Sequence, residues 1–354
     1  MNPGTVFATI AAPIAIAVIA AGLCVLYRAI PRTGATKRAA VLSAAIAAVG
    51  AAVWLVVGLP LGGGVMPGLI PAITVLAGIA TTLATFTVRE RATSTATAVV
   101  FAAVWCAAVF VPVAIADFSP TGYFESLGLE PLDHGGALAV FVAPASAAVA
   151  VLVIERGRKS RSTLQAYPTA PIWTTVAMWA GWVLALVCLE LAIDVVTPQI
   201  VLNAILAPVF GVLGWLVIQR VHHQVSTVAG AAAGLVTGLA GITAGAAFVD
   251  PLWASVTGFG AAALSAAFVH RRVRLSQLES WFIVGAHLVA PVTGLALLGL
   301  FASGIGFVFS GQISLAQAQF VSIVVTIVYS VVVSALLWLV LRLTLARRSI
   351  KASG

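Results

Sequence analysis

One histidine lies in the middle of a long apolar stretch, where its side chain could do chemistry. His287 follows Trp281-Phe-Ile-Val-Gly-Ala and precedes Leu-Val-Ala-Pro291. An imidazole at such a place can accept, donate or relay a proton, because its unperturbed pKa is about 6.5. The alternative is a packed histidine whose ring hydrogen-bonds to a backbone carbonyl. We expect His287 to line a pore if the stretch crosses a membrane, since lipid cannot satisfy a polar side chain.

Other titratable residues have more modest expected roles. Asp133 and His134 stand immediately before Gly135-Gly136 and an apolar run, so Asp133 is expected to cap a helix. Glu190 lies near the end of another apolar run. His222, His223 and His270 lie in basic loops without carboxylates or cysteines at metal-ligand spacing. The chain also lacks a Ser/His/Asp set, a phosphate loop or a carboxylate pair, so we expect no metal, no cofactor and no enzymatic activity.

The elements that hold these residues are membrane helices. Of the 354 residues, 62% are hydrophobic and only 8% are charged, which excludes a soluble enzyme and a nucleic-acid binder. A membrane-crossing helix needs roughly 17–25 mostly apolar residues. Eleven such stretches are predicted, over residues 6–27, 39–60, 66–88, 95–116, 135–154, 171–193, 199–218, 225–248, 251–270, 280–303 and 318–342.

The charges between these stretches predict the orientation of the chain. If the first loop is cytoplasmic and the sides alternate, all 18 basic residues fall on one side. The opposite side holds seven acidic residues, namely Asp117, Glu125, Glu130, Asp133, Glu190, Asp194 and Asp250. This bias predicts a multi-pass protein of the cell membrane with the N-terminus outside and the C-terminus in the cytoplasm.

An odd number of spans suits two five-helix halves plus one further helix. Five spans per half invert the second half relative to the first, as in many transporters. We therefore predict an all-α membrane protein with a single transmembrane domain over 1–354. Its first half is about 6–154, its second half about 171–303 and its extra helix about 318–342. The internal similarity is weak, and the suggested correspondence is between His134 and His287.

Several segments, taken in order, resemble the ammonium transporter family (Amt/Mep/Rh). Leu132-Asp133-His134-Gly135-Gly136 is similar to the family's L-D-F-A-G-G, one residue short. His287 to Gly294 matches the spacing of H-G-V-G-G-I-V-G. Further similar segments begin at Trp54, Glu90, Phe101, Phe110, Trp179, Ala233 and Val325. With eleven spans and the expected orientation, the chain is identified as a divergent member of this family.

The resemblance implies a homotrimer in which each subunit holds a narrow apolar pore lined by two histidines. His287 matches the second pore histidine, and Asp133 matches the acidic residue that supports the site. The first pore histidine falls on Val140, or on Phe141 if the missing residue is placed elsewhere. Phe118 aligns with the vestibule tryptophan and offers a weaker cation–π face. The gate phenylalanines fall on Leu76 and Ala185, and the vestibule serine on Leu189.

The function that the resemblance implies is a channel for ammonia, or a similar small solute. A neutral molecule crosses an apolar wall far more easily than ammonium, whose dehydration is very costly. Two alternatives remain open: a non-conducting relative that serves as a sensor or assembly partner, and a transporter of another small substrate. About a dozen residues follow Arg342, so the resemblance gives little support for docking of the family's trimeric nitrogen-regulatory partner. We expect the lipid bilayer as a partner and no nucleic acid.

Overall fold

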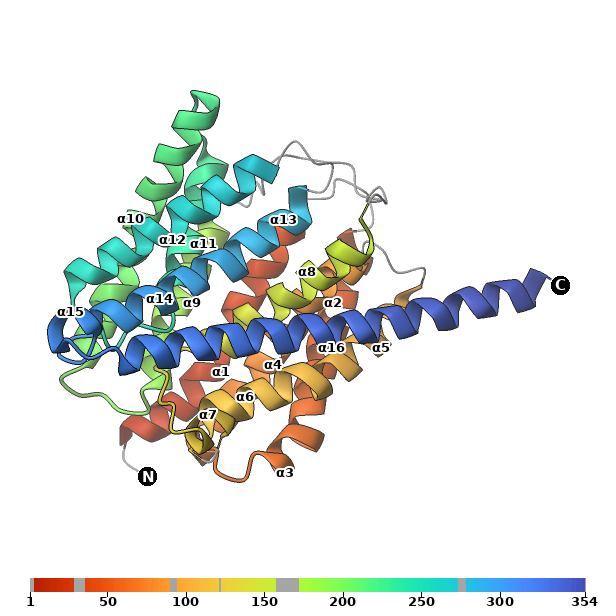
Figure 1. Cartoon of the computed structure of the whole chain (residues 1–354), viewed down its shortest axis with the longest axis horizontal. Coiled ribbons are helices and arrows are strands. Elements are labelled where there is room, and N and C mark those ends of the chain that lie inside the picture. The colour runs from red at the N-terminus through yellow and green to blue at the C-terminus, as the bar shows by residue number, and fades with distance from the viewer. Residues whose placement is uncertain are drawn as a thin grey trace.

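The computed structural model describes residues 3–28, 36–89, 94–120, 122–156, 172–272 and 278–353, and these are almost entirely helical (Figure 1). Among them, no strand forms beyond an isolated bridge between Val249 and Ala302. The helical segments are α1 Pro3–Arg28, α2 Thr36–Val53, η1 Trp54–Gly58, α3 Leu59–Leu61, η2 Pro67–Leu69, α4 Ile70–Arg89, α5 Thr95–Trp105, η3 Cys106–Phe110, α6 Val111–Phe118, α7 Tyr123–Ser126, η4 Leu138–Val142, α8 Ala143–Ile154, α9 Ile172–Leu189, α10 Thr197–His223, α11 Val228–Ile242, α12 Pro251–Arg272, α13 Leu278–Val284, η5 Gly285–Val289, α14 Ala290–Phe301, α15 Phe307–Ser310 and α16 Ser314–Ser353.

The helices confirm the prediction of an all-α membrane protein. Within the described residues, eight are long and apolar enough to cross a membrane, and three shorter apolar helices occupy other predicted spans. The shorter ones cover Leu138–Ile154, Thr174–Leu189 and Val228–Ile242. The eighth predicted span, 225–248, is thus helical over a shorter stretch than expected, because the chain turns after Ile242. Six of the basic residues predicted for the cytoplasmic side lie outside the described residues: Arg32, Arg91, Arg158, Lys159, Arg161 and Arg274, as does Glu90.

Four of the apolar helices contain a five-residue π-helical segment, and a proline follows each segment at the same distance. The segments η1, η3, η4 and η5 are followed, two residues after each ends, by Pro60, Pro112, Pro144 and Pro291. Proline has no backbone N–H, and its ring clashes with the carbonyl four residues earlier. A local widening of the helix relieves that clash, and such π-bulges are frequent at functional sites.

Two of these segments pair at the centre of the molecule. Helix η4–α8 and helix α13–η5–α14 lie in contact and run in opposite directions (Figure 1). Their sequences match around the π segments: Leu-Ala-Val-Phe-Val-Ala-Pro over 138–144 and Gly-Ala-His-Leu-Val-Ala-Pro over 285–291. This antiparallel match supports the predicted inverted repeat, while the boundaries of the two halves stay a prediction.

The last helix, α16, lies across the bundle and extends beyond it (Figure 1). It is fastened by side-chain hydrogen bonds along one face. The Tyr329 hydroxyl donates to the carbonyl of Ala108 (2.6 Å), and the Ser330 hydroxyl donates to the carbonyl of Ala143 (2.6 Å). The Trp105 indole N–H donates to Ser334 Oγ (3.0 Å). Polar groups on membrane helices find partners across helix interfaces in this way, because lipid offers none.

Glycines bring the helices α10 and α11 into close contact. A Cβ atom at Gly238 would lie 2.7 Å from the carbonyl oxygen of Ala207, and one at Gly234 would lie 2.6 Å from that of Gly211. Any larger residue would force the two backbones apart. The glycine stripe of the eighth span therefore serves helix packing, as expected for small residues in membrane bundles.

Candidate functional site

His287 is the third of the five residues of η5 and is fully buried. The carbonyl of Gly285, in the same segment, accepts a hydrogen bond from Ser265 Oγ of α12 (2.8 Å). This contact fixes η5 against α12 close to the imidazole. The position at the core of the bundle follows from the pairing of the two proline-terminated helices.

Phe141 is the residue of the first half that faces His287. Its ring stacks on the imidazole with the centroids 5.3 Å apart and the planes 25° from parallel. On its other side it stacks on Trp182 of α9, with centroids 5.1 Å apart and planes at 14°. Phe141 therefore lies between Trp182 and His287 in a column of three rings. Val140, its neighbour, holds the position in η4 that His287 holds in η5.

Two rings of this column, Phe141 and Trp182, also line a small cavity. Its volume is about 20 Å³ of space for a water-sized molecule. A cavity needs roughly 10–15 Å³ on this measure to hold one water, so there is room for about one molecule of that size. The lining includes five of the predicted site residues: Leu76, Val140, Phe141, Ala185 and Leu189. The structure thus brings together positions far apart in the sequence, and their roles as gate and pore stay predictions.

Sequence reasoning missed two residues that line the same cavity, Trp182 and Thr243. The Trp182 indole N–H donates to the Thr243 hydroxyl (3.1 Å), which in turn donates to the carbonyl of Leu239 (2.7 Å). Both polar groups are therefore satisfied by protein, and the rest of the cavity wall is apolar. Both residues stand in the segments that resemble the family, and that was the available signal.

Asp133 caps the N-terminus of helix η4–α8, beside this cavity. Its two carboxylate oxygens accept the N–H groups of Ala137 and Leu138, each at 2.7 Å. The carboxyl of Asp117, at the end of α6, is hydrogen-bonded to Asp133. Burial raises the pKa of Asp133 to about 6, although the two amide N–H groups act in the opposite direction. Two carboxyls in contact share a proton more readily than they both ionise.

His134 forms a hydrogen bond between the same turn and α9. Its ring Nε2 lies 2.7 Å from the carbonyl of Leu186, so this nitrogen carries the proton that is donated. Burial lowers the pKa of His134, and the bond to Leu186 partly opposes that effect. His134 precedes η4 and lies outside the helical repeat. The suggested correspondence between His134 and His287 is therefore wrong, and Val140 is the counterpart of His287.

Phe118, predicted to offer a vestibule face, packs on the same turn. A Cβ atom at Gly136 would collide with the Phe118 ring, and Gly136 has a positive φ of 68°. Both the close approach and the left-handed backbone require glycine at this position. The ring of Phe118 is half-buried, and its role in recruiting a cation stays a prediction.

His222, His223 and His270 lie on helices, and the prediction that they lie in basic loops is wrong. α10 continues to His223 and α12 to Arg272. His223 Nε2 lies 3.0 Å from His270 Nδ1, and the rings of His222 and His270 stack. Across the described ranges, no group of three or more histidine, cysteine or acidic residues has an arrangement that could hold a metal ion.

The fold and this site define a polytopic membrane protein with a small apolar cavity, one wall of which is a phenyl ring stacked on a buried histidine. The sequence pattern of the Ammonium Transporter Family matches residues 63–353. The chain therefore belongs to that family.

Relatives and solved structures agree with this assignment. An ammonium transporter of Mycobacterium bovis is 28% identical over 270 residues, which cover 70% of this chain and 57% of the relative. The structure of Saccharomyces cerevisiae Mep2 matches with a TM-score of 0.83 and 20% identity, over 95% of this chain and 87% of Mep2. A solved sensor Amt protein matches with a TM-score of 0.82 and 18% identity, over 96% of this chain and 93% of that protein. This chain thus spans little more than half the length of the mycobacterial relative.

Proposed function

We propose that this chain is an ammonium-transporter-like channel of the cell membrane that passes ammonia, or a similar small neutral solute. One observation carries the proposal most directly: an apolar cavity of about 20 Å³ is lined by Phe141, whose ring stacks on His287. Its wall suits a molecule of the size of ammonia and disfavours an ion, because an unpaired charge would lose its hydration there. The proposal also draws on the relatives named as ammonium transporters.

The predicted roles of the individual residues form part of this proposal. His287, Val140 and Phe141 line the path, while Leu76, Ala185 and Leu189 form its outer gate. Phe118 contributes to the vestibule, and Asp133 holds the turn that positions η4. We further propose a homotrimer with its N-terminus outside and its C-terminus in the cytoplasm.

The mechanism differs from a relay between two imidazoles. A phenyl ring, which cannot accept or donate a proton, faces His287. Ammonium would give its proton to water outside, and the resulting neutral ammonia would enter the cavity and pass the edge of the Phe141 ring. The solute would then contact His287, whose imidazole lies against the Phe141 ring. Transport by this route carries no net charge.

The test measures flux in liposomes that contain the purified protein. An imposed ammonium gradient should change the internal pH, read with a trapped dye, faster than in empty vesicles, without an electrical current. Ala185→Phe fills the cavity and should lower the flux at least tenfold. Ala177→Phe, on an exposed position of the same helix, is the matched control and should leave the flux unchanged. Folded protein with no flux above empty vesicles would remove the proposal.

A non-conducting relative is the second candidate, and one observation favours it. Phe141 lies flat between Trp182 and His287, so the ring separates the cavity from the imidazole. If the ring is a permanent plug, the wild type should show no flux, and Phe141→Ala should create one. If the pore conducts, the wild type already does so.

A further inference from the structure

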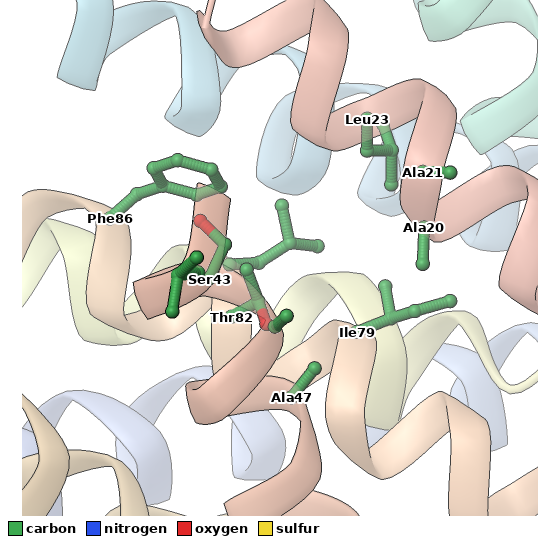
Figure 2. Close-up of a pocket in the computed structure, with 11 residues that line it drawn as sticks. Ala20, Ala21, Leu23, Ser43, Ala47, Ile79, Thr82 and Phe86 are labelled. Carbon is green, nitrogen blue, oxygen red and sulfur yellow. The ribbon is translucent and has the colours of Figure 1, made fainter. Parts of the chain in front are cut away.

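A second cavity, of about 430 Å³, lies between the helices α1, α2 and α4 (Figure 2). Among the described residues that line it there is no histidine and no charged residue. Its polar lining residues are Ser43 and Thr82, and the Thr82 hydroxyl already donates to the carbonyl of Gly78 (2.8 Å). The titratable groups that have no place in the proposed pore gather elsewhere, where α10 and α12 pack against each other (Figure 1).

Three imidazoles touch one another at the C-terminal ends of α10 and α12, which face the cytoplasm in the proposed orientation. His223 and His222 are exposed, whereas His270 is buried. His223 Nε2 lies 3.0 Å from His270 Nδ1, so one of these nitrogens donates a proton and the other accepts it. The ring of His222 stacks on His270, with the centroids 5.7 Å apart. The hydrogen bond therefore requires that at least one of the two facing nitrogens carries no proton.

The charged residues near this contact are positive. Arg220 lies on the last turn of α10 and Arg271 on the last turn of α12, and both are exposed. Among the described side chains of the packed helices α11 and α13 there is no acidic residue. One proton can be shared between His223 and His270. A second proton leaves a hydrogen on both facing nitrogens and places two like charges on rings 4.6 Å apart.

The end of α12 also supports the pore segment η5. Val269, the residue before His270, packs on Gly285 so closely that a Cβ atom there would lie 2.5 Å from Val269 Cγ2. Gly285 stands two residues before the buried imidazole of η5. The ring of Trp215 forms a second connection, because it contacts both His270 and Phe282 of α13 with centroids 5.9 Å apart in each case. A displacement of His270 therefore changes the packing of the helix that carries the pore histidine.

We propose that His223 and His270 form a pH-sensitive contact, which holds the ends of α10 and α12 together near neutral pH and releases them when the cytoplasm becomes acidic. Release withdraws Val269 from Gly285, so that η5 loses the support that keeps its imidazole on the Phe141 ring. Transport should therefore fall as the cytoplasmic pH drops below about 6. The effect on transport rests on the proposed function, whereas the separation of the two helix ends does not.

Amide hydrogen exchange of the full-length protein in nanodiscs, read by mass spectrometry, tests the separation of the helix ends. With labelling times scaled for the chemical effect of pH, the last turns of α10 and α12 in the wild type should exchange at least tenfold faster at about pH 5.5 than at about pH 7.5. His270→Phe keeps a ring against Trp215 but cannot be protonated, so its exchange should be equal at both pH values. Val221→Ala is the matched control on the same turn of α10, because Val221 is 66% exposed, and it should respond as the wild type does.

Two results of the exchange experiment overturn the proposal. One is equal exchange of the wild type at the two pH values, and the other is a response of the same size in His270→Phe. If His270→Phe fails to fold, His223→Gln takes its place, because the glutamine amide can still hydrogen-bond to His270 Nδ1 and carries no charge.

Flux in the liposome assay separates this inference from the proposed function. With both sides of the membrane at about pH 5.5 and the same ammonium gradient, the wild type should carry at most a fifth of the flux of His270→Phe, and at about pH 7.5 the two should be equal. Comparing the two proteins at one pH cancels the effect of pH on the supply of ammonia. Equal flux at both pH values overturns the effect on transport. Absence of flux in both proteins contradicts the proposed function, and the exchange result then decides whether the contact responds to pH.

Discussion

Val140 and His287 occupy the same place in two matching helices. Each is the third residue of a five-residue π segment that an Ala-Pro pair follows. The two helices touch and run in opposite directions (Figure 1). One half of the molecule therefore presents an imidazole at this place, and the other half presents an isopropyl group.

The first prediction concerns the variant Val140→His, which gives each half of the molecule an imidazole at this place. Val140 lines the internal cavity, so Val140→His should add a proton-accepting group to the path. A proton could then accompany the solute between two imidazoles, and transport should become electrogenic. Currents on solid-supported membranes measure this directly. Val140→Leu is the control of similar size, and equal currents from the two variants would contradict the prediction.

The second prediction concerns His287 itself. His287→Leu removes the ring nitrogens and retains an apolar side chain of similar bulk against Phe141. Flux per folded protein should change at least tenfold, while the melting temperature should fall by only a few degrees. If His287 is merely a packed core residue, the result reverses: strong destabilisation, because a buried partner is left unsatisfied, and unchanged flux in the protein that folds. His222→Leu, at an exposed histidine, is the control.

The third prediction follows from the contact between Asp117 and Asp133. The pKa of Asp133 is raised from 3.8 to about 6, so the folded state binds the proton more tightly than the unfolded chain does. The favourable contribution is complete below about pH 4 and is lost as the pH rises through about 6. Asp117→Asn removes one of the two buried carboxyls in contact, so fewer protons are taken up on folding and the pH dependence of stability between 4 and 6 should be shallower than that of the wild type.

Thermal unfolding in detergent across this pH range tests the comparison. His134 contributes in the opposite sense, because its lowered pKa makes the folded state less stable as the pH falls below about 6.5. Both proteins share that contribution, so the difference between their curves isolates the carboxyl pair. Parallel curves for wild type and Asp117→Asn would refute the prediction.

The fourth prediction concerns the attachment of α16 to α8. Glu155 is buried and accepts hydrogen bonds from the Trp338 indole (3.0 Å), and its Oε1 lies 3.3 Å from Arg342 Nη1. Because the Arg342 side chain is 43% exposed, water screens the pair, and Arg342→Gln should cost about 1–2 kcal/mol, less than the loss of a fully buried pair. The double variant with Glu155→Gln should recover part of that loss, since no charge then stays buried.

Thermal unfolding of the two single variants and the double variant forms a cycle that measures the coupling. Arg220→Gln, for which the described part of the chain shows no ion pair, should have a melting temperature close to that of the wild type. Strict additivity of the Glu155 and Arg342 variants would show that the contact contributes no coupling energy.

The membrane class and the places of the helices could be predicted from the amino-acid sequence. Long apolar runs separated by short polar segments have few other solutions, because lipid excludes unpaired backbone groups. The role of Asp133 at a helix end also follows from local order, since a carboxylate reaches the N–H groups of the next few residues. The four prolines that accompany the π segments are likewise visible along the chain.

The site depends on contacts between segments far apart along the chain. Sequence order leaves open whether Val140 or Phe141 stands opposite His287. Packing places the Phe141 ring on the imidazole and Val140 in the repeat position, because Trp182, some 40 residues further on, holds the other face of that ring. Thr243 and the cluster of His222, His223 and His270 were missed for the same reason. Apolar periodicity specifies which residues leave water, but the rotation of each helix and the shape of its side chains set which of them meet.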